Sequence, residues 1–169
     1  MNTLVCGRAN YTIIIVTVSR GFAKIQHRCF PLCVGLFLCY NCAMDKAKLL
    51  TLIERESVII WDSLCETYPT LVAYDPPKLK LNPYTWRTAG MCFQDLNVVE
   101  LGYKFFKSNT KNFDCMMQVI LPHELIHQAD FNLHGESEKS CGHGAQWRKM
   151  MLQYGLPADK FHPMEISRK

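Results

Sequence analysis

The stretch Leu121-Pro122-His123-Glu124-Leu125-Ile126-His127 decides how the rest of this chain is interpreted. It contains His-Glu-x-x-His, a pattern typical of zinc peptidases in which both histidines bind the ion. On a helix, residues four apart lie about 40° apart around the axis and about 6 Å apart along it. His123 and His127 can therefore present their imidazoles to one ion. Glu124 lies beside that face, within reach of a water on the ion.

The charge of the chain is unevenly distributed. The chain has 169 residues with 19 basic and 15 acidic side chains, and residues 1–43 contain Arg8, Arg20, Lys24 and Arg28 but no acidic residue. Residues 44–169 are therefore neutral, and bulk charge gives no reason to expect nucleic-acid binding. Such binding would need a local patch. The basic residues that could form one near the motif are Arg87, Lys104, Lys107, Lys111, Arg148 and Lys149.

The nine cysteines have no framework spacing. Five of them precede residue 44, and the others are Cys65, Cys92, Cys115 and Cys141. An odd number without a framework favours free thiols in a reducing compartment over a disulfide scaffold. We therefore expect a cytoplasmic protein, or one in the host cytoplasm or nucleoid if its origin is viral. Export and membrane anchoring are not expected.

Residues 1–43 differ in character from the remainder. The apolar run Cys29–Ala43 contains Pro31 and Gly35 and is shorter than the ~20 residues that cross a bilayer as a helix. A signal peptide and a structural zinc site on Cys29, Cys33, Cys39 and Cys42 are two alternative interpretations. We prefer a third, in which residues 1–43 are a leader of doubtful order or a mis-assigned start. Residues 44–169 then form one domain.

From Met44 onward, periodicity and turn residues predict an α+β domain. Asp45 is a candidate N-cap for a helix over about 46–65. Strands are expected over 78–81, 89–93 and 97–101, a polar loop over 109–112, a metal-binding helix over 113–130, a loop over 134–144 and a short helix over 145–154. Pro122 removes a backbone hydrogen bond inside the metal-binding helix, so a bend or a late helix start before His123 is expected.

A catalytic zinc commonly keeps three protein ligands and one open position. The candidates for the third ligand are His134, His143, Glu136, Glu138 and His162. The spacing H-E-x-x-H-x-x-G-x-x-H fails here, because Asp130 and Leu133 occupy the glycine and histidine positions. Gly142-His143-Gly144 is the preferred segment, since glycines on both sides let the backbone bring an imidazole close to the first helix.

The two histidine motifs together resemble the SprT-like family, which includes the Spartan DNA–protein crosslink proteases. The resemblance rests on His123-Glu-Leu-Ile-His127 and on Gly142-His143-Gly-x-x-Trp147, and it extends over roughly residues 46–166. Two features depart from the family pattern. Leu101-Gly102 stands where the family usually has Leu-Asn, and the sequence contains no four-cysteine zinc ribbon such as many members carry at the C-terminal end.

The resemblance implies a compact zincin-like α+β domain, with an N-terminal helix, a small sheet, the metal-binding helix and a short C-terminal helix. It implies His123, His127 and His143 as ligands of Zn²⁺ and Glu124 as the catalytic acid/base. The expected substrate is a protein, including DNA-bound or crosslinked ones. Two alternatives remain open, namely a non-catalytic zinc-stabilised binding module and a regulatory peptidase with one partner. Tyr84, Tyr103 and Tyr154 are candidates for stabilising the oxyanion.

Overall fold

The computed structural model describes residues 44–135, 142–159 and 164. The expectations for residues 1–43, including a zinc site on their cysteines, fall outside the described part of the chain. The same is true of three candidate ligands, Glu136, Glu138 and His162. Among the described helices, none is long and apolar enough to cross a membrane.

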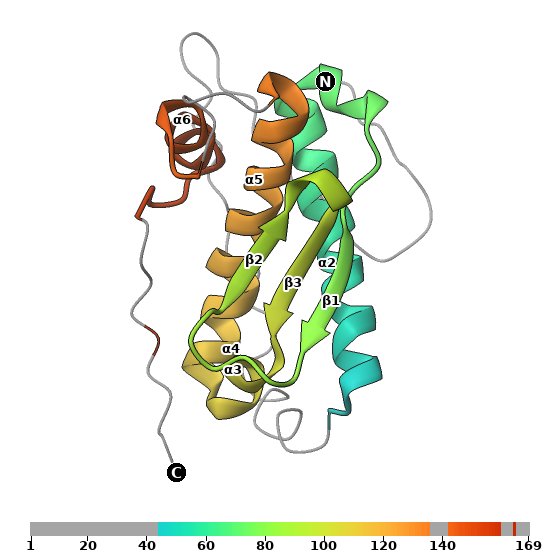
Figure 1. The fold of residues 1–169 in the computed structure, drawn as a ribbon, viewed down its shortest axis with the longest axis vertical. Helices are drawn as coiled ribbons and strands as arrows, with labels where there is room; N and C mark the ends of the chain where they lie inside the picture. Colours follow the sequence, from blue (N-terminus) through green and yellow to red (C-terminus); the bar gives the residue numbers. More distant parts are fainter. Residues whose placement is uncertain (1–43, 136–141, 160–163, 165–169) are drawn as a thin grey trace, which may run out of the picture.

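The described residues form an α+β fold in which helices pack against a three-stranded sheet. The sheet has the order β1 (Lys78–Asn82), β3 (Val98–Gly102), β2 (Gly90–Phe93). Helices α2 (Lys46–Thr67) and α5 (Leu121–His134) lie together behind it (Figure 1). Helix α5 contacts β2 and helix α2 contacts β1, while α6 (Ala145–Tyr154) packs against α5. This arrangement confirms the fold class that the sequence predicted.

Helix α2 (Lys46–Thr67) forms because one of its faces is apolar at helical spacing. The face that it buries consists of Leu49, Ile53, Ile60, Trp61 and Leu64. Asp45 caps the helix, and its side chain accepts a hydrogen bond from the Lys48 backbone N–H at 2.8 Å. Pro69 follows the last turn and begins a short 3₁₀ helix, η1 (Pro69–Ala73). The predicted helix and its cap are confirmed.

The sheet places one strand edge beside α5. Strand β3 (Val98–Gly102) pairs in parallel with β1 (Lys78–Asn82) and antiparallel with β2 (Gly90–Phe93). A 3₁₀ turn, η2 (Gln94–Leu96), joins β2 to β3, and Asn97 adopts a left-handed conformation after it. The three predicted strands are confirmed, and Gly102, which departs from the family pattern, closes β3 opposite Asn82.

The prediction of a polar loop over 109–112 is wrong. Helix α3 (Tyr103–Ser108) is followed directly by helix α4 (Thr110–Cys115), and Asn109 is the N-cap between them. The Asn109 side chain accepts the Asn112 backbone N–H at 2.7 Å, so the polar residues form a cap and not a loop. Phe106 and Phe113 bury their rings edge to face across this junction, with centroids 5.7 Å apart.

A π-helical turn precedes the metal-binding helix. Residues Met116–Ile120 form η3, where the Leu121 N–H bonds to the Met116 carbonyl five residues back. Helix α5 then runs from Leu121 to His134, with Pro122 in its first turn, where a missing N–H is tolerated. The expected late start before His123 is thus confirmed, although the helix ends four residues later than predicted.

Candidate metal centre

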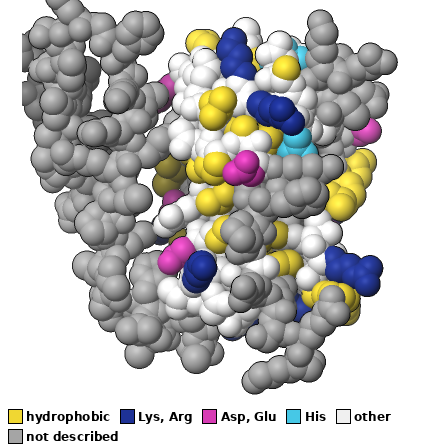
Figure 2. Space-filling view, turned by 90° about the vertical axis from the view of Figure 1, so that its left-hand side faces the viewer, with side chains coloured by type: hydrophobic (Ala, Val, Ile, Leu, Met, Phe, Trp, Pro, Cys, Tyr) yellow, Lys and Arg dark blue, Asp and Glu magenta, His cyan; other side chains and the backbone are white. Residues whose placement is uncertain are grey.

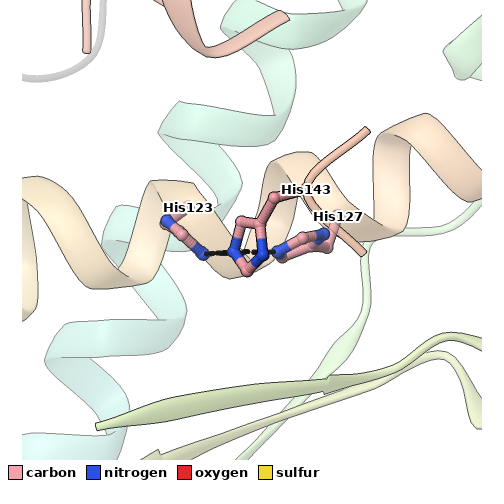
Figure 3. Close-up of side chains that lie close together, drawn as sticks. All are labelled: His123, His127 and His143. Carbon is pink, nitrogen blue, oxygen red and sulfur yellow. Dashed lines mark hydrogen bonds between the residues drawn. The ribbon is translucent and has the colours of Figure 1, made fainter. Parts of the chain in front are cut away.

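Three histidine side chains meet at one point between α5 and the loop before α6. The His123 and His127 Nε2 atoms are 3.2 Å apart, and the His143 Nε2 atom lies 3.0 Å from the first and 3.4 Å from the second. Figure 3 shows the rings turned toward one another, two from the helix and one from the segment that crosses it. The structure therefore brings together the two histidines of the motif and the preferred third candidate.

Hydrogen bonding alone cannot satisfy this triangle of nitrogens. A hydrogen bond needs one nitrogen that carries the hydrogen and one that accepts it. Three mutually adjacent nitrogens always leave one pair with two donors or two acceptors. A shared cation removes the conflict, because tetrahedral ligands about 2.05 Å from an ion are about 3.3 Å apart. The observed separations of 3.0–3.4 Å match that spacing, so the three side chains could hold a metal ion.

The two motif histidines are held by a deeply buried helix. Every residue of α5 from Leu121 to Asp130 is buried. Burial, and to a smaller extent the neighbouring His143, lowers the pKa of His127 to about 3. This ring is therefore neutral at pH 7, and neutral imidazole is the form that binds a metal.

His143 reaches the helix because glycines flank it. Gly142 has a φ of 65°, a left-handed conformation that side chains rarely adopt, and Gly144 is the N-cap of α6 (Ala145–Tyr154). Helix α6 has the bounds that the sequence predicted and ends at Gly155, which has a φ of 85°. The two glycines and helix α6 together bring the third imidazole against His127, which lies 16 residues earlier in the sequence.

Trp147 forms the back wall of the cluster. Its side chain is fully buried, and its ring centroid lies 4.7 Å from that of His123, 5.1 Å from that of His127 and 4.4 Å from that of His143. The contact with His127 is stacked, and the other two are edge to face. One rigid indole therefore restricts the orientation of all three imidazoles.

Glu124 is buried beside the histidines, with 7% of its surface exposed. Burial raises the pKa of its carboxyl to about 8, and a hydrogen bond from the Cys92 backbone N–H opposes part of that shift. A carboxyl whose pKa lies near neutrality can both take and return a proton. Glu124 is thus a buried carboxyl that can change its protonation state near neutral pH.

The histidines and Glu124 open into one cleft. Its volume is about 680 Å³, and its walls include Trp86, Arg87, Gly90 and Gln94 besides the four site residues. Apolar side chains from α3 and η3, Phe105 and Ile120, line another part of it. The cleft therefore offers both a polar centre and apolar surface to a bound chain.

A hydrogen-bond network that sequence reasoning missed fastens α5 to the β2 end of the sheet. Gln94 donates its side-chain N–H to the His127 carbonyl at 3.0 Å, and Gln128 donates to the Gln94 carbonyl at 3.2 Å. Gln128 is buried and also accepts from the Cys92 thiol at 3.4 Å. Its position directly after the second histidine was the only signal available in the sequence.

Among the described residues, His134 is not part of the histidine cluster, and the three tyrosine candidates do not line its cleft. The His134 Nδ1 atom lies 2.7 Å from the Asp130 carboxylate, and His134 is not in the three-histidine group. Tyr84 is 84% exposed, and Tyr154 is half-buried near Glu56. Neither these two nor Tyr103 is among the described residues that line the cleft.

The surface charge is mixed on the face that Figure 2 displays. Basic and acidic side chains are interspersed there among hydrophobic ones. Of the six basic residues named from the sequence, Arg87 lines the cleft, with its guanidinium 4.8 Å from the Trp86 ring centroid. Lys107 donates to the Met44 carbonyl at 2.8 Å. The cysteines in the described part of the chain, Cys65, Cys92 and Cys115, are free thiols.

Comparison with known proteins gives a family match over the part of the chain that contains this site. The model of the SprT-like family matches residues 74–166, which include all three histidines, Glu124 and Trp147. "Protein SprT" of Glaesserella parasuis serovar 5 (strain SH0165) is 29% identical over 82 residues, which are 48% of this chain and 49% of that protein. The chain thus spans about half the length of this relative. No solved structure matches this chain. With more than half of its residues matched by the family model, the chain belongs to the SprT-like family.

Proposed function

We propose that this protein is a zinc-dependent endopeptidase of the SprT-like type. One observation carries the proposal: a buried carboxyl with a raised pKa and a metal-competent triangle of histidines share a single cleft. A purely structural metal site has no need of such a carboxyl. Three imidazoles that leave a fourth position open are a donor set typical of catalytic zinc.

When bound, zinc would polarise a substrate carbonyl and lower the pKa of a water toward about 7. His123, His127 and His143 would hold the ion, and Trp147 would fix their ring orientations. Glu124 would take a proton from the attacking water and pass it to the nitrogen of the leaving amine. General acid–base help of this kind contributes about 10²–10⁴ to the rate.

The edge of β2 supports a peptide as the substrate. The Gly102 N–H bonds to the Ala89 carbonyl at 2.7 Å, so under antiparallel alternation the N–H and carbonyl of Gly90 and the carbonyl of Cys92 point away from β3, while the outward Cys92 N–H bonds to Glu124. Within the described residues β2 pairs with β3 alone, and Gly90, Met91 and Cys92 line the cleft. An extended peptide could therefore add to this edge as a further strand. DNA-bound or crosslinked proteins are the substrate class that the resemblance to the Spartan proteases favours.

The test is a cleavage assay with zinc-loaded wild type and Glu124→Gln. Substrates are an unfolded protein, a DNA-binding protein free in solution and the same protein on single-stranded DNA. We expect wild type to cleave and Glu124→Gln to keep its zinc and lose at least about 10²-fold in rate. Faster cleavage on DNA would support the crosslink class. Equal cleavage with and without DNA would contradict it, and no cleavage of any substrate would favour a binding module.

A further inference from the structure

Gly90 lies against the side chain of Glu124 with no room for a methyl group. A Cβ atom built on Gly90 would be 2.7 Å from both Cγ and Oε1 of Glu124, and 2.9 Å from its Cδ. Carbon atoms in contact normally lie about 3.5–4.0 Å apart. Any residue other than glycine at this position would therefore push the Glu124 carboxyl out of its place.

The backbone at Gly90 does not itself require glycine. The described glycines with positive φ are Gly135, Gly142 and Gly155, whereas Gly90 is the first residue of β2 and pairs with Leu101. Glycine in a strand is less favourable than alanine, and it often marks a place where another group approaches closely. Here the approaching group is the Glu124 side chain.

A second contact from the same strand acts on the same carboxyl. Cys92, two residues along β2 on the same face, donates its backbone N–H to Glu124. The Glu124 carboxyl is thus positioned by two features of β2: the space left by the missing side chain of Gly90, and the Cys92 N–H that donates to it. Both belong to the strand edge that faces the cleft.

We propose that Gly90 is a positioning residue, which fixes the site of the Glu124 carboxyl by leaving space for it against β2. Its effect on cleavage rests on the proposed function, whereas the steric coupling to Glu124 does not. In Gly90→Ala the flexible end of Glu124 must move and its bond to the Cys92 N–H must lengthen. The sheet itself has no reason to unfold.

The first arm of the test measures cleavage by zinc-loaded Gly90→Ala. We expect kcat to fall at least tenfold, with KM changed less than threefold and zinc content unchanged. Gly102→Ala is the matched control for crowding in the sheet, because its Cβ would meet Phe105 at 2.6 Å and the Thr88 carbonyl at 3.1 Å, not Glu124. Gly102→Ala should lower the Tm more than Gly90→Ala does. A Gly90→Ala enzyme with wild-type kcat would overturn the proposal.

The second arm is a double-mutant cycle on stability, which needs no activity. Gly90→Ala is introduced into wild type and into Glu124→Ala, and the Tm of each metal-free protein is measured. We expect alanine to be neutral or destabilising beside Glu124, and to raise the Tm by about 2 °C or more once the Glu124 side chain is gone. Equal shifts in both backgrounds would overturn the coupling. If wild type cleaves nothing, the proposed function fails and this cycle alone decides whether Gly90 positions Glu124.

Discussion

At the scale of single residues, the site concentrates groups that are costly to bury. Glu124 and the two helix histidines are ionisable groups that are at most 8% exposed. Burying polar groups without full hydrogen bonding destabilises a fold. The arrangement therefore supports the proposed metal site and the proposed role of Glu124 more than a role in stability.

The raised pKa of the Glu124 carboxyl should be visible in the pH dependence of stability. Its pKa is raised from 4.5 to about 8, so the folded metal-free protein binds this proton more tightly than the unfolded chain does. The stabilising effect is complete below about pH 4.5 and is lost as the pH rises through about 8. Urea denaturation from pH 5 to pH 9 should show metal-free wild type losing more stability than Glu124→Gln. Parallel curves for the two proteins would contradict the raised pKa.

Trp147 should matter to the metal as well as to the core. Trp147→Phe removes part of the surface that packs on the three imidazoles, so we expect weaker zinc binding together with a loss of stability of about 1–3 kcal/mol. Trp61→Phe is the matched control, since Trp61 is also buried but belongs to α2. It should lose stability without losing zinc affinity. Titration of both variants with zinc measures the difference, and equal affinities would show that the indole is only a core residue.

At the scale of elements, local patterns predicted what local forces determine. The apolar spacing and the Asp45 cap located α2, and Gly155 located the end of α6. The loop predicted at 109–112 failed because burial of Phe106 and Phe113 favours two helices joined at an Asn cap. The π turn at Met116–Ile120 has no propensity signal of its own. Only Pro122 hinted that the hydrogen-bond pattern would change there.

The same distinction between local and long-range forces applies to the candidate site. The i, i+4 spacing placed His123 and His127 on one helix face without knowledge of the fold. The convergence of His143 depends on how α6 docks on α5, which spacing cannot give. The residues therefore left several candidates, among which the flanking glycines favoured His143 and the family resemblance implied it. The support from Gly90 and Cys92 depends on how β2 meets α5. The only sign of this support in the sequence was a glycine within a predicted strand.

The Asp45 cap provides a test of the first helix. Asp45→Ala leaves the Lys48 N–H without its side-chain partner, and we expect a loss of about 1 kcal/mol in the free energy of unfolding. Asp62→Ala is the matched control, because Asp62 is exposed in the middle of the same helix. Its effect should stay within about 0.5 kcal/mol. Chemical denaturation measures both, and equal losses would show that Asp45 does not act as a cap.

At the scale of the whole molecule, the metal would join α5 to the loop that leads into α6. A ligand that binds only the folded state stabilises it by about 4 kcal/mol when its free concentration is 1,000 times the Kd. We therefore expect a chelator to lower the Tm of wild type by several degrees and added zinc to restore it. Glu124→Gln should respond in the same way, because it keeps all three histidines. A Tm that ignores both chelator and zinc would argue against a bound ion.

The central claim is that a histidine from the loop before α6 completes a metal centre begun on α5. It is tested most directly by the zinc content per chain of wild type, His143→Ala and His134→Ala, measured after dialysis against a weak chelator. His134→Ala is the matched control, since His134 pairs with Asp130 outside the cluster. We predict one zinc per chain in wild type and in His134→Ala, and far less in His143→Ala. Full zinc in His143→Ala with loss in His134→Ala would contradict this account.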